Sequence, residues 1–346
     1  MTAITNQLFH DVRAEQAGFS FGKPQRPDAK TLSIVLPLLR QTEAKRSYTT
    51  FPETDKVLVF DTGKIDEMRV ENPTDANVFI RSGTLFTGAT QARAAQRSHI
   101  ALPHDKSVVP VRCVHASHGI SSNAGVKYGG ITPLHTDQKN YNAGYNMKSQ
   151  HETWANVHAT NTMFMRCSNI SSFSASAGLS ANAPVAGSFA AHDPGVTWHG
   201  EPQPAMDNLA GNFDKFALDF EKILSKVKRH PRQVGLALIT DTGVQTIEWF
   251  DHTDSWQALH EAAIKRLGTE LVREDPKAVF EFKPENAVQM VDEVLALPFK
   301  TNRIYLEVPP IGPRVEITGL TAKDFVGEVT TLNDVVIHVV LLKKAA

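Results

Sequence analysis

Short hydrophobic runs separated by turn residues fill the first third of the chain. Alternating or continuous apolar positions occur in residues 31–39, 56–60 and 107–114, and sequences such as Asp61-Thr62-Gly63 and Asn72-Pro73 interrupt the series. Gly and Asn accept positive φ and Pro lacks an amide donor, so these residues end strands. Because no helical periods lie between the runs, the pattern predicts an antiparallel β-domain, sandwich-like or barrel-like.

The spacing of apolar residues changes in the second half of the chain. Apolar residues recur every three or four positions, which predicts one helical stripe that Asn212 caps. The stripe consists of Phe213, Phe216, Phe220, Ile223, Leu224 and Val227. Residues 233–239 and 244–250 flank Asp241-Thr242-Gly243 and predict a hairpin.

Further helices and strands are expected downstream. A helix begins at Asp254 and another covers about 285–297, and strands are predicted at 304–308, 314–317 and 335–342. Ser149 and Glu152 fit a capping box that opens a helix, whereas the serine/alanine tract 168–190 is typical of a surface loop.

These patterns define the predicted fold class and domains. We expect an α+β protein in which an N-terminal antiparallel β-sandwich-like half packs against a C-terminal α+β half. The first half is residues 1–148, β-rich with a loop-rich end, and the second is residues 149–346, an α+β domain with C-terminal strands.

Composition narrows the class of protein. The 346 residues include 36 basic and 37 acidic side chains, well mixed along the chain, which argues against nucleic acid as a partner. The longest apolar runs fall far short of the ~20 residues that span a bilayer. The N-terminus lacks a signal-peptide pattern, and Cys113 and Cys167 are too few for a disulfide framework. We therefore expect a reduced, cytoplasmic protein.

Several segments in order resemble a known family. Residues 57–60, 68–72, 79–88, 91–93 and 109–114 are similar to the β-domain of proteins named for their association with ADP-ribosylglycohydrolase and rhodanese-phosphatase genes. Residues 150–154 and 233–271 are similar to the second half of that family. The resemblance covers about residues 56–272, so we expect the first 55 and the last 70 or so residues to lie outside it. It implies a link to NAD or ADP-ribose metabolism and no transferable mechanism.

The chain departs from the family pattern at one place. Where members usually carry Cys-Val-Glu followed by an arginine and a tryptophan, this chain has Cys113-Val114-His115 and then His118-Gly119. Gln91 and Arg93 do match the family. If 91–97 is a strand, alternation would place Gln91, Arg93 and Arg97 on one face, where they could bind a phosphate or carboxylate. The alternative is a solvated strand face or an ion pair with an acidic residue.

Histidines suggest a second candidate site. Seven of the 14 lie between residues 99 and 158. His115 and His118 follow a predicted strand, and His135 or Asp137 is the candidate third ligand of a zinc-type site. No HExxH or paired CxxC motif supports it, and exposed loop histidines are the alternative. No cofactor is expected apart from this zinc.

Three functions follow from these features. The first is a non-catalytic or accessory protein that binds a small nucleotide-related ligand, with the candidate site Gln91, Arg93 and Arg97, and forms a homo-oligomer. The second is a self-assembling structural protein, and the third is a metal-dependent hydrolase that uses His115 and His118. For the oligomer, residues 298–346 supply the expected interface, and the apolar strand 335–342 pairs either within its own sheet or across subunits.

Overall fold

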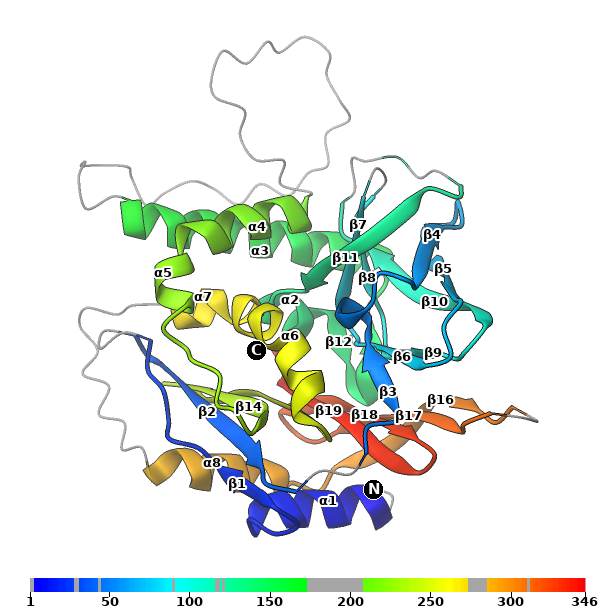
Figure 1. Ribbon diagram of the computed structural model, residues 1–346. Coiled ribbons are helices and arrows are strands. Elements are labelled where there is room, and N and C mark those ends of the chain that lie inside the picture. Colours follow the sequence, from blue (N-terminus) through cyan, green and yellow to red (C-terminus); the bar gives the residue numbers. More distant parts are fainter. Residues whose placement is uncertain are drawn as a thin grey trace.

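The computed structural model describes residues 3–27, 31–42, 45–88, 91–115, 119, 122–172, 208–272, 285–309 and 312–345. From residue 173 onward, the predicted serine/alanine loop lies outside these ranges. The fold is a mixture of α and β structure dominated by antiparallel sheets (Figure 1).

A single eight-stranded sheet forms the base of the molecule. Each pair of neighbouring strands in this sheet is antiparallel. In spatial order the strands are β1 (Phe19–Phe21), β2 (Ser33–Arg40), β14 (Gln233–Thr240), β15 (Gly243–Phe250), β19 (Val335–Lys343), β18 (Phe325–Leu332), β17 (Val315–Thr321) and β16 (Lys300–Glu307). Because β2 pairs with β14, the sheet takes strands from both sides of the predicted boundary near residue 148.

Helices cover both faces of this sheet (Figure 1). On one face lie α1 (Ala3–Arg13) and α8 (Glu285–Leu295), where the ring of Phe9 packs 5.7 Å from that of Trp249. The opposite face is covered by α6 (Thr253–Arg266) and α7 (Gly268–Leu271). The sheet therefore has an apolar core on each side.

The predicted antiparallel β-domain, expected as a sandwich-like or barrel-like form, is a closed barrel and not a β-sandwich. Its strands are β4 (Leu58–Asp61), β5 (Glu67–Asn72), β7 (Thr84–Gly88), β8 (Arg93–Ala95), β10 (Asp105–Cys113) and β11 (Gly125–Ile131), in the order β10-β5-β4-β11-β7-β8. The short β8 pairs with both β7 and β10, so every strand has two neighbours. Closure leaves no free edge, which two stacked sheets would have.

Short elements connect the barrel to the large sheet. They comprise a sheet of β3 (Tyr48–Thr50), β6 (Asn77–Ile80) and β9 (His99–Ala101), a pair of β12 (Tyr141–Asn142) and β13 (Asn146–Met147), the 3-10 turns η1 (Phe51–Glu53) and η2 (Ala143–Tyr145), and helix α2 (Leu134–Asn140). The pairing of β3 with β6 is parallel, unlike the predicted antiparallel pattern.

Two helices pack against the barrel, and they test two predicted N-caps. At the start of α3 (Gln150–Ser172), Ser149 Oγ accepts from the Glu152 amide at 3.4 Å and the Ser149 amide donates to Glu152 Oε2 at 3.1 Å, which confirms the capping box. The predicted single helix 213–227 is wrong. It is divided at Phe220 into α4 (Leu209–Asp219) and α5 (Glu221–Leu224), and Asn208 caps α4 instead of Asn212.

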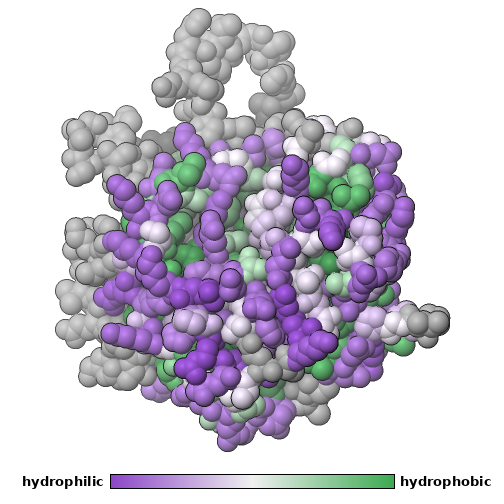
Figure 2. Space-filling model, in the orientation of Figure 1, coloured by the Kyte–Doolittle hydropathy of each residue, from purple (hydrophilic) through white to green (hydrophobic). Residues whose placement is uncertain are grey.

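The hairpin of β14 and β15 and the helices α6 and α8 confirm the sequence analysis. Gly243 turns the hairpin at a φ of 101°. Strand β19 lies between β15 and β18, so the apolar run 335–342 pairs within its own sheet and cannot also pair across subunits. None of the described helices is long and apolar enough to cross a membrane. The face shown in Figure 2 is mainly hydrophilic, with apolar residues in small patches.

Candidate functional site

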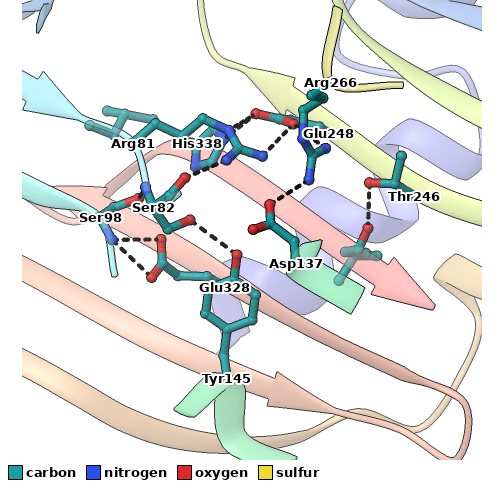
Figure 3. A network of polar contacts seen from close by, with 12 residues as sticks. Arg81, Ser82, Ser98, Asp137, Tyr145, Thr246, Glu248, Arg266, Glu328 and His338 are labelled. Carbon is teal, nitrogen blue, oxygen red and sulfur yellow. Dashed lines mark hydrogen bonds and ion pairs between the residues drawn. The ribbon is translucent and has the colours of Figure 1, made fainter. Parts of the chain in front are cut away.

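A buried cluster of charged side chains joins the barrel side of the molecule to the large sheet (Figure 3). We call it the junction cluster. It consists of Arg81 after β6, Asp137 of α2, Glu248 of β15, Arg266 of α6 and His338 of β19. Each of these side chains is at most 3 % exposed. Five segments far apart in sequence therefore meet at one set of charges.

Glu248 is the centre of the junction cluster. Its carboxylate accepts two hydrogen bonds from Arg81, one of them at 2.7 Å, and lies 3.4 Å from Arg266 Nη1. His338 Nε2 lies 3.1 Å from Glu248 Oε1, and Arg266 Nη2 donates to Asp137 Oδ2 at 2.8 Å. Two arginines and two carboxylates thus balance their charges inside the protein.

Burial and charge act in opposite directions on these groups. Burial alone would raise the pKa of Glu248, but the charge and hydrogen bonds of Arg81, with His338 and Arg266, hold that pKa well below its usual value. The pKa of Asp137 is raised, because burial outweighs the attraction of Arg266 and Arg81. Burial also lowers the pKa of His338 despite its bond to Glu248, which favours a neutral ring.

A third carboxylate, Glu328 of β18, lies beside the junction cluster (Figure 3). Its two oxygens accept from the Ser98 amide at 3.3 and 3.1 Å, and burial raises its pKa. Nearby, the hydroxyls of Ser82 and Tyr145 are 3.0 Å apart. All these groups are buried, and together with the junction cluster they connect the barrel side of the molecule to the large sheet.

The buried histidines make stability depend on pH. Burial lowers the pKa of His99 to about 3 and the pKa values of His135 and His260 to about 4. Unfolding returns each ring to its ordinary pKa near ~6.5, so the unfolded chain binds more protons below that pH. We expect the free energy of unfolding to decrease as the pH falls from 6.5 toward 4, with His99 alone contributing about 2 kcal/mol between roughly pH 7 and pH 5.

Urea unfolding at the two pH values measures this effect. His99→Gln should reduce the pH dependence, whereas the same change at His158, which is exposed on α3, should leave it as in the wild type. A protein equally stable at both pH values would contradict the expectation.

A polar cavity lies next to the junction cluster. We call it the lysine pocket, and its volume is about 390 Å³. It is lined by Gln138, Lys139, Tyr141, Asn142, Ala143, Lys148, Asn156, Lys344 and Ala345. These nine described residues include three lysines and no carboxylate side chain, so their side chains carry a net positive charge. The ammonium of Lys344 already donates to the carbonyls of Ala322 and Lys323, both at 2.8 Å, so Lys139 and Lys148 are the lysines considered for ligand binding.

The residues that line the lysine pocket are held by contacts with residues in or next to the junction cluster. Helix α2 carries Asp137 of the cluster and Lys139 of the pocket two residues apart. The ring of Tyr141 stacks on that of Tyr145 with centroids 4.0 Å apart. Across the pocket, Asn156 Nδ2 donates to Asn140 Oδ1 at 2.8 Å, which ties α3 to α2.

A larger groove of about 670 Å³ lies between α4, α5 and α6. Its charged lining has both signs, since Glu221 and Glu261 accompany Lys265, and Lys265 is already paired with Asp214. Leu218 in the same lining is 72 % exposed. Unlike the lysine pocket, this groove does not favour a ligand of one charge.

The structure separates the residues of the predicted anion site. Arg93 is fully buried, and its Nη2 lies 3.2 Å from Asp61 Oδ2, so the alternative of an ion pair describes it better than ligand contact. Gln91 is 7 % exposed and precedes β8 instead of lying in it. Arg97 follows β8, and its guanidinium lies 4.0 Å above the ring of Tyr305 in the large sheet.

The predicted metal site is only partly described. His118 lies outside the described residues, so the pair of His115 and His118 has no described geometry. His115 forms a bridge with Asn208, and His135 lies on α2. Among the described residues, no group of three or more His, Cys, Asp or Glu side chains could hold a metal ion.

Sequence reasoning did not find the lysine pocket or the junction cluster. Lys139 and Lys148 are nine positions apart, Lys344 is almost 200 positions further along the chain, and the three belong to no motif. The pocket becomes visible only once α2, α3 and the C-terminal residues are placed together.

Comparison with protein families gave one match. A family model described as the ARG and Rhodanese-Phosphatase-superfamily-associated Protein domain matches residues 18–342. The expectation that the family covers only about residues 56–272 is therefore wrong, because the outer segments supply β1, β2 and β16–β19 of the large sheet. Comparisons with curated proteins and with solved structures gave no significant match. The chain belongs to the family of proteins associated with ADP-ribosylglycohydrolases and the rhodanese-phosphatase superfamily.

Proposed function

We propose that this protein is an accessory, non-catalytic protein that binds a small phosphate-bearing molecule, related to NAD or ADP-ribose, in the lysine pocket. The observation that carries the proposal is the presence of three lysines and no carboxylate side chain among the described lining residues. The name of the family supports the ligand class, since it records an association with ADP-ribosylglycohydrolases. A cytoplasmic location stays a prediction.

The chemistry of the pocket suits a phosphate next to a sugar. Lysine ammonium groups are compact point charges that attract phosphate oxygens. Asn142 brings an amide group that can bond hydroxyls, whereas Asn156 Nδ2 and Gln138 Nε2 already donate to Asn140 and Gln245. A volume of about 390 Å³ falls within the usual range for small-molecule sites.

An unsatisfied donor lies beside the pocket. Asn140 Nδ2 is buried and has no hydrogen-bond partner in the described part of the chain, although its Oδ1 accepts from Asn156. A buried donor without a partner costs free energy. Because Asn140 is fully buried and does not line the pocket, this donor is no argument for a particular ligand.

Calorimetric titration with ADP-ribose, pyrophosphate and ribose tests the proposal. ADP-ribose and pyrophosphate should bind, and ribose should not, because the lysines attract the phosphates. Lys139→Gln and Lys148→Gln should each weaken ADP-ribose by about 1–3 kcal/mol, the range for a charge-assisted hydrogen bond.

The matched control is Lys127→Gln, which removes an exposed lysine from β11 of the barrel. It should bind ADP-ribose as the wild type does. If Lys127→Gln and Lys139→Gln weakened binding equally, the effect would be one of overall charge. In that case, or if ADP-ribose and pyrophosphate failed to bind the wild type, the proposal would be wrong.

A further inference from the structure

Strand β16 is a long free edge of the large sheet. It spans Lys300–Glu307, and among the described residues β17 is its only neighbouring strand, whereas the opposite edge, β1, has three residues. In Figure 1, β16 runs out beyond the rest of the fold. A free edge presents unpaired amides and carbonyls that another strand can bind.

A register shift places the two oppositely charged ends of β16 on one face. Lys300 is opposite Thr321 and Glu307 is opposite Val315 in β17, and the shift makes Ile304 an extra residue of β16. Thr321 and Val315 are six positions apart, so their side chains lie on the same face of the sheet. Their partners Lys300 and Glu307 therefore share that face too.

We propose that two copies of this chain form a dimer by antiparallel pairing of β16 with β16. A two-fold axis perpendicular to the sheet, passing beside Arg303 and Ile304, keeps each face on the same side and places Lys300 opposite Glu307 of the partner subunit. The symmetry repeats this pair, so the interface contains two pairs of opposite charge. On the other face, Thr301 lies opposite Leu306 of the partner subunit.

The charges of β16 favour a second copy over another strand. Lysine and arginine on an edge normally prevent pairing with a foreign strand. Here an antiparallel copy in this register supplies the matching charge for Lys300. The Tyr305 hydroxyl donates to Glu307 Oε2 at 2.8 Å, which fixes the position of the Glu307 carboxylate. Leu306, 38 % exposed, would be covered at the same time.

This dimer is independent of ligand binding and replaces the predicted interface. Residues 298–346 were expected to form the oligomer, and β19 cannot do so because it is a central strand. The edge strand β16 lies in the same region and is free.

A charge-swap series measured by sedimentation equilibrium tests the dimer. Lys300→Glu and Glu307→Lys each place like charges opposite one another twice, and each should raise the dimer dissociation constant by about tenfold or more. The double variant, Lys300→Glu with Glu307→Lys, restores opposite charges and should return the dissociation constant toward that of the wild type. Lys323→Glu, an exposed change in the turn after β17, should have no effect.

Each result bears directly on the proposal. Because both β16 side chains are partly exposed, the variants should remain folded, and circular dichroism checks this. A wild type that is monomeric at micromolar concentration overturns the dimer. A double variant whose dimer dissociation constant is no lower than those of the single variants also overturns the proposal, since Lys300 and Glu307 would then not pair across the interface.

Discussion

Glu248→Gln is expected to destabilise the protein by about 3–5 kcal/mol, the cost of removing one partner from a buried set of ion pairs. The substitution keeps the size of the side chain and removes its charge. Arg81 and Arg266 would then remain buried with Asp137 as their nearest carboxylate, and His338 would lose its anionic partner. Such a loss is a large part of the stability of a typical domain.

Urea unfolding followed by circular dichroism measures this change. Glu293→Gln is the matched control, because Glu293 is exposed on α8 and accepts a hydrogen bond from Gln289 of the same helix. The control should shift the free energy of unfolding by less than about 0.5 kcal/mol. Equal effects of the two variants would show that the junction cluster does not hold the fold together.

Arg93→Ala is expected to destabilise the protein by about 3 kcal/mol or more, because it leaves the Asp61 carboxylate buried without its guanidinium. The Arg93 guanidinium also donates to the carbonyl of Lys64 at 2.9 Å. Since Arg93 has no exposed surface, affinity for ADP-ribose should not change in protein that is still folded.

Stability and ADP-ribose affinity together distinguish the two roles considered for Arg93, a buried ion pair with Asp61 and contact with a ligand. Arg69→Ala serves as the control, because Arg69 lies on strand β5 of the same barrel with its side chain 37 % exposed, and the change should cost far less stability. Normal stability of Arg93→Ala together with lost ADP-ribose binding would restore Arg93 as a ligand residue and contradict the structure.

Local patterns predicted the elements whose sequence requirements are local. The hairpin of β14 and β15 follows from Asp241-Thr242-Gly243, since the turn needs a positive φ at Gly243. Helix α3 follows from Ser149 and Glu152. Strand β18 was missed because it contains Gly327 and the buried Glu328, which do not resemble a strand core. Gly327 is needed there, since a Cβ atom would lie 2.4 Å from the carbonyl oxygen of Val340.

The position of charged side chains depends on closure of the barrel and on contacts distant in sequence. Alternation placed Arg93 on a strand face but could not show that Asp61 of β4 would face it. In the same way, Lys139 and Lys344 are more than 200 residues apart and share a pocket only in the folded chain. The ligand class could be suggested from the family resemblance, whereas the candidate site required the structure.

A crystal structure of the protein soaked with tungstate tests the central claim most directly. Tungstate is a tetrahedral anion like phosphate, and its anomalous scattering locates it without reference to the expected site. We predict an anomalous peak in the lysine pocket, within reach of Lys139 and Lys148, that is lost in the Lys139→Gln and Lys148→Gln double variant. Tungstate bound only elsewhere on the protein, with the lysine pocket free of it, would contradict the account.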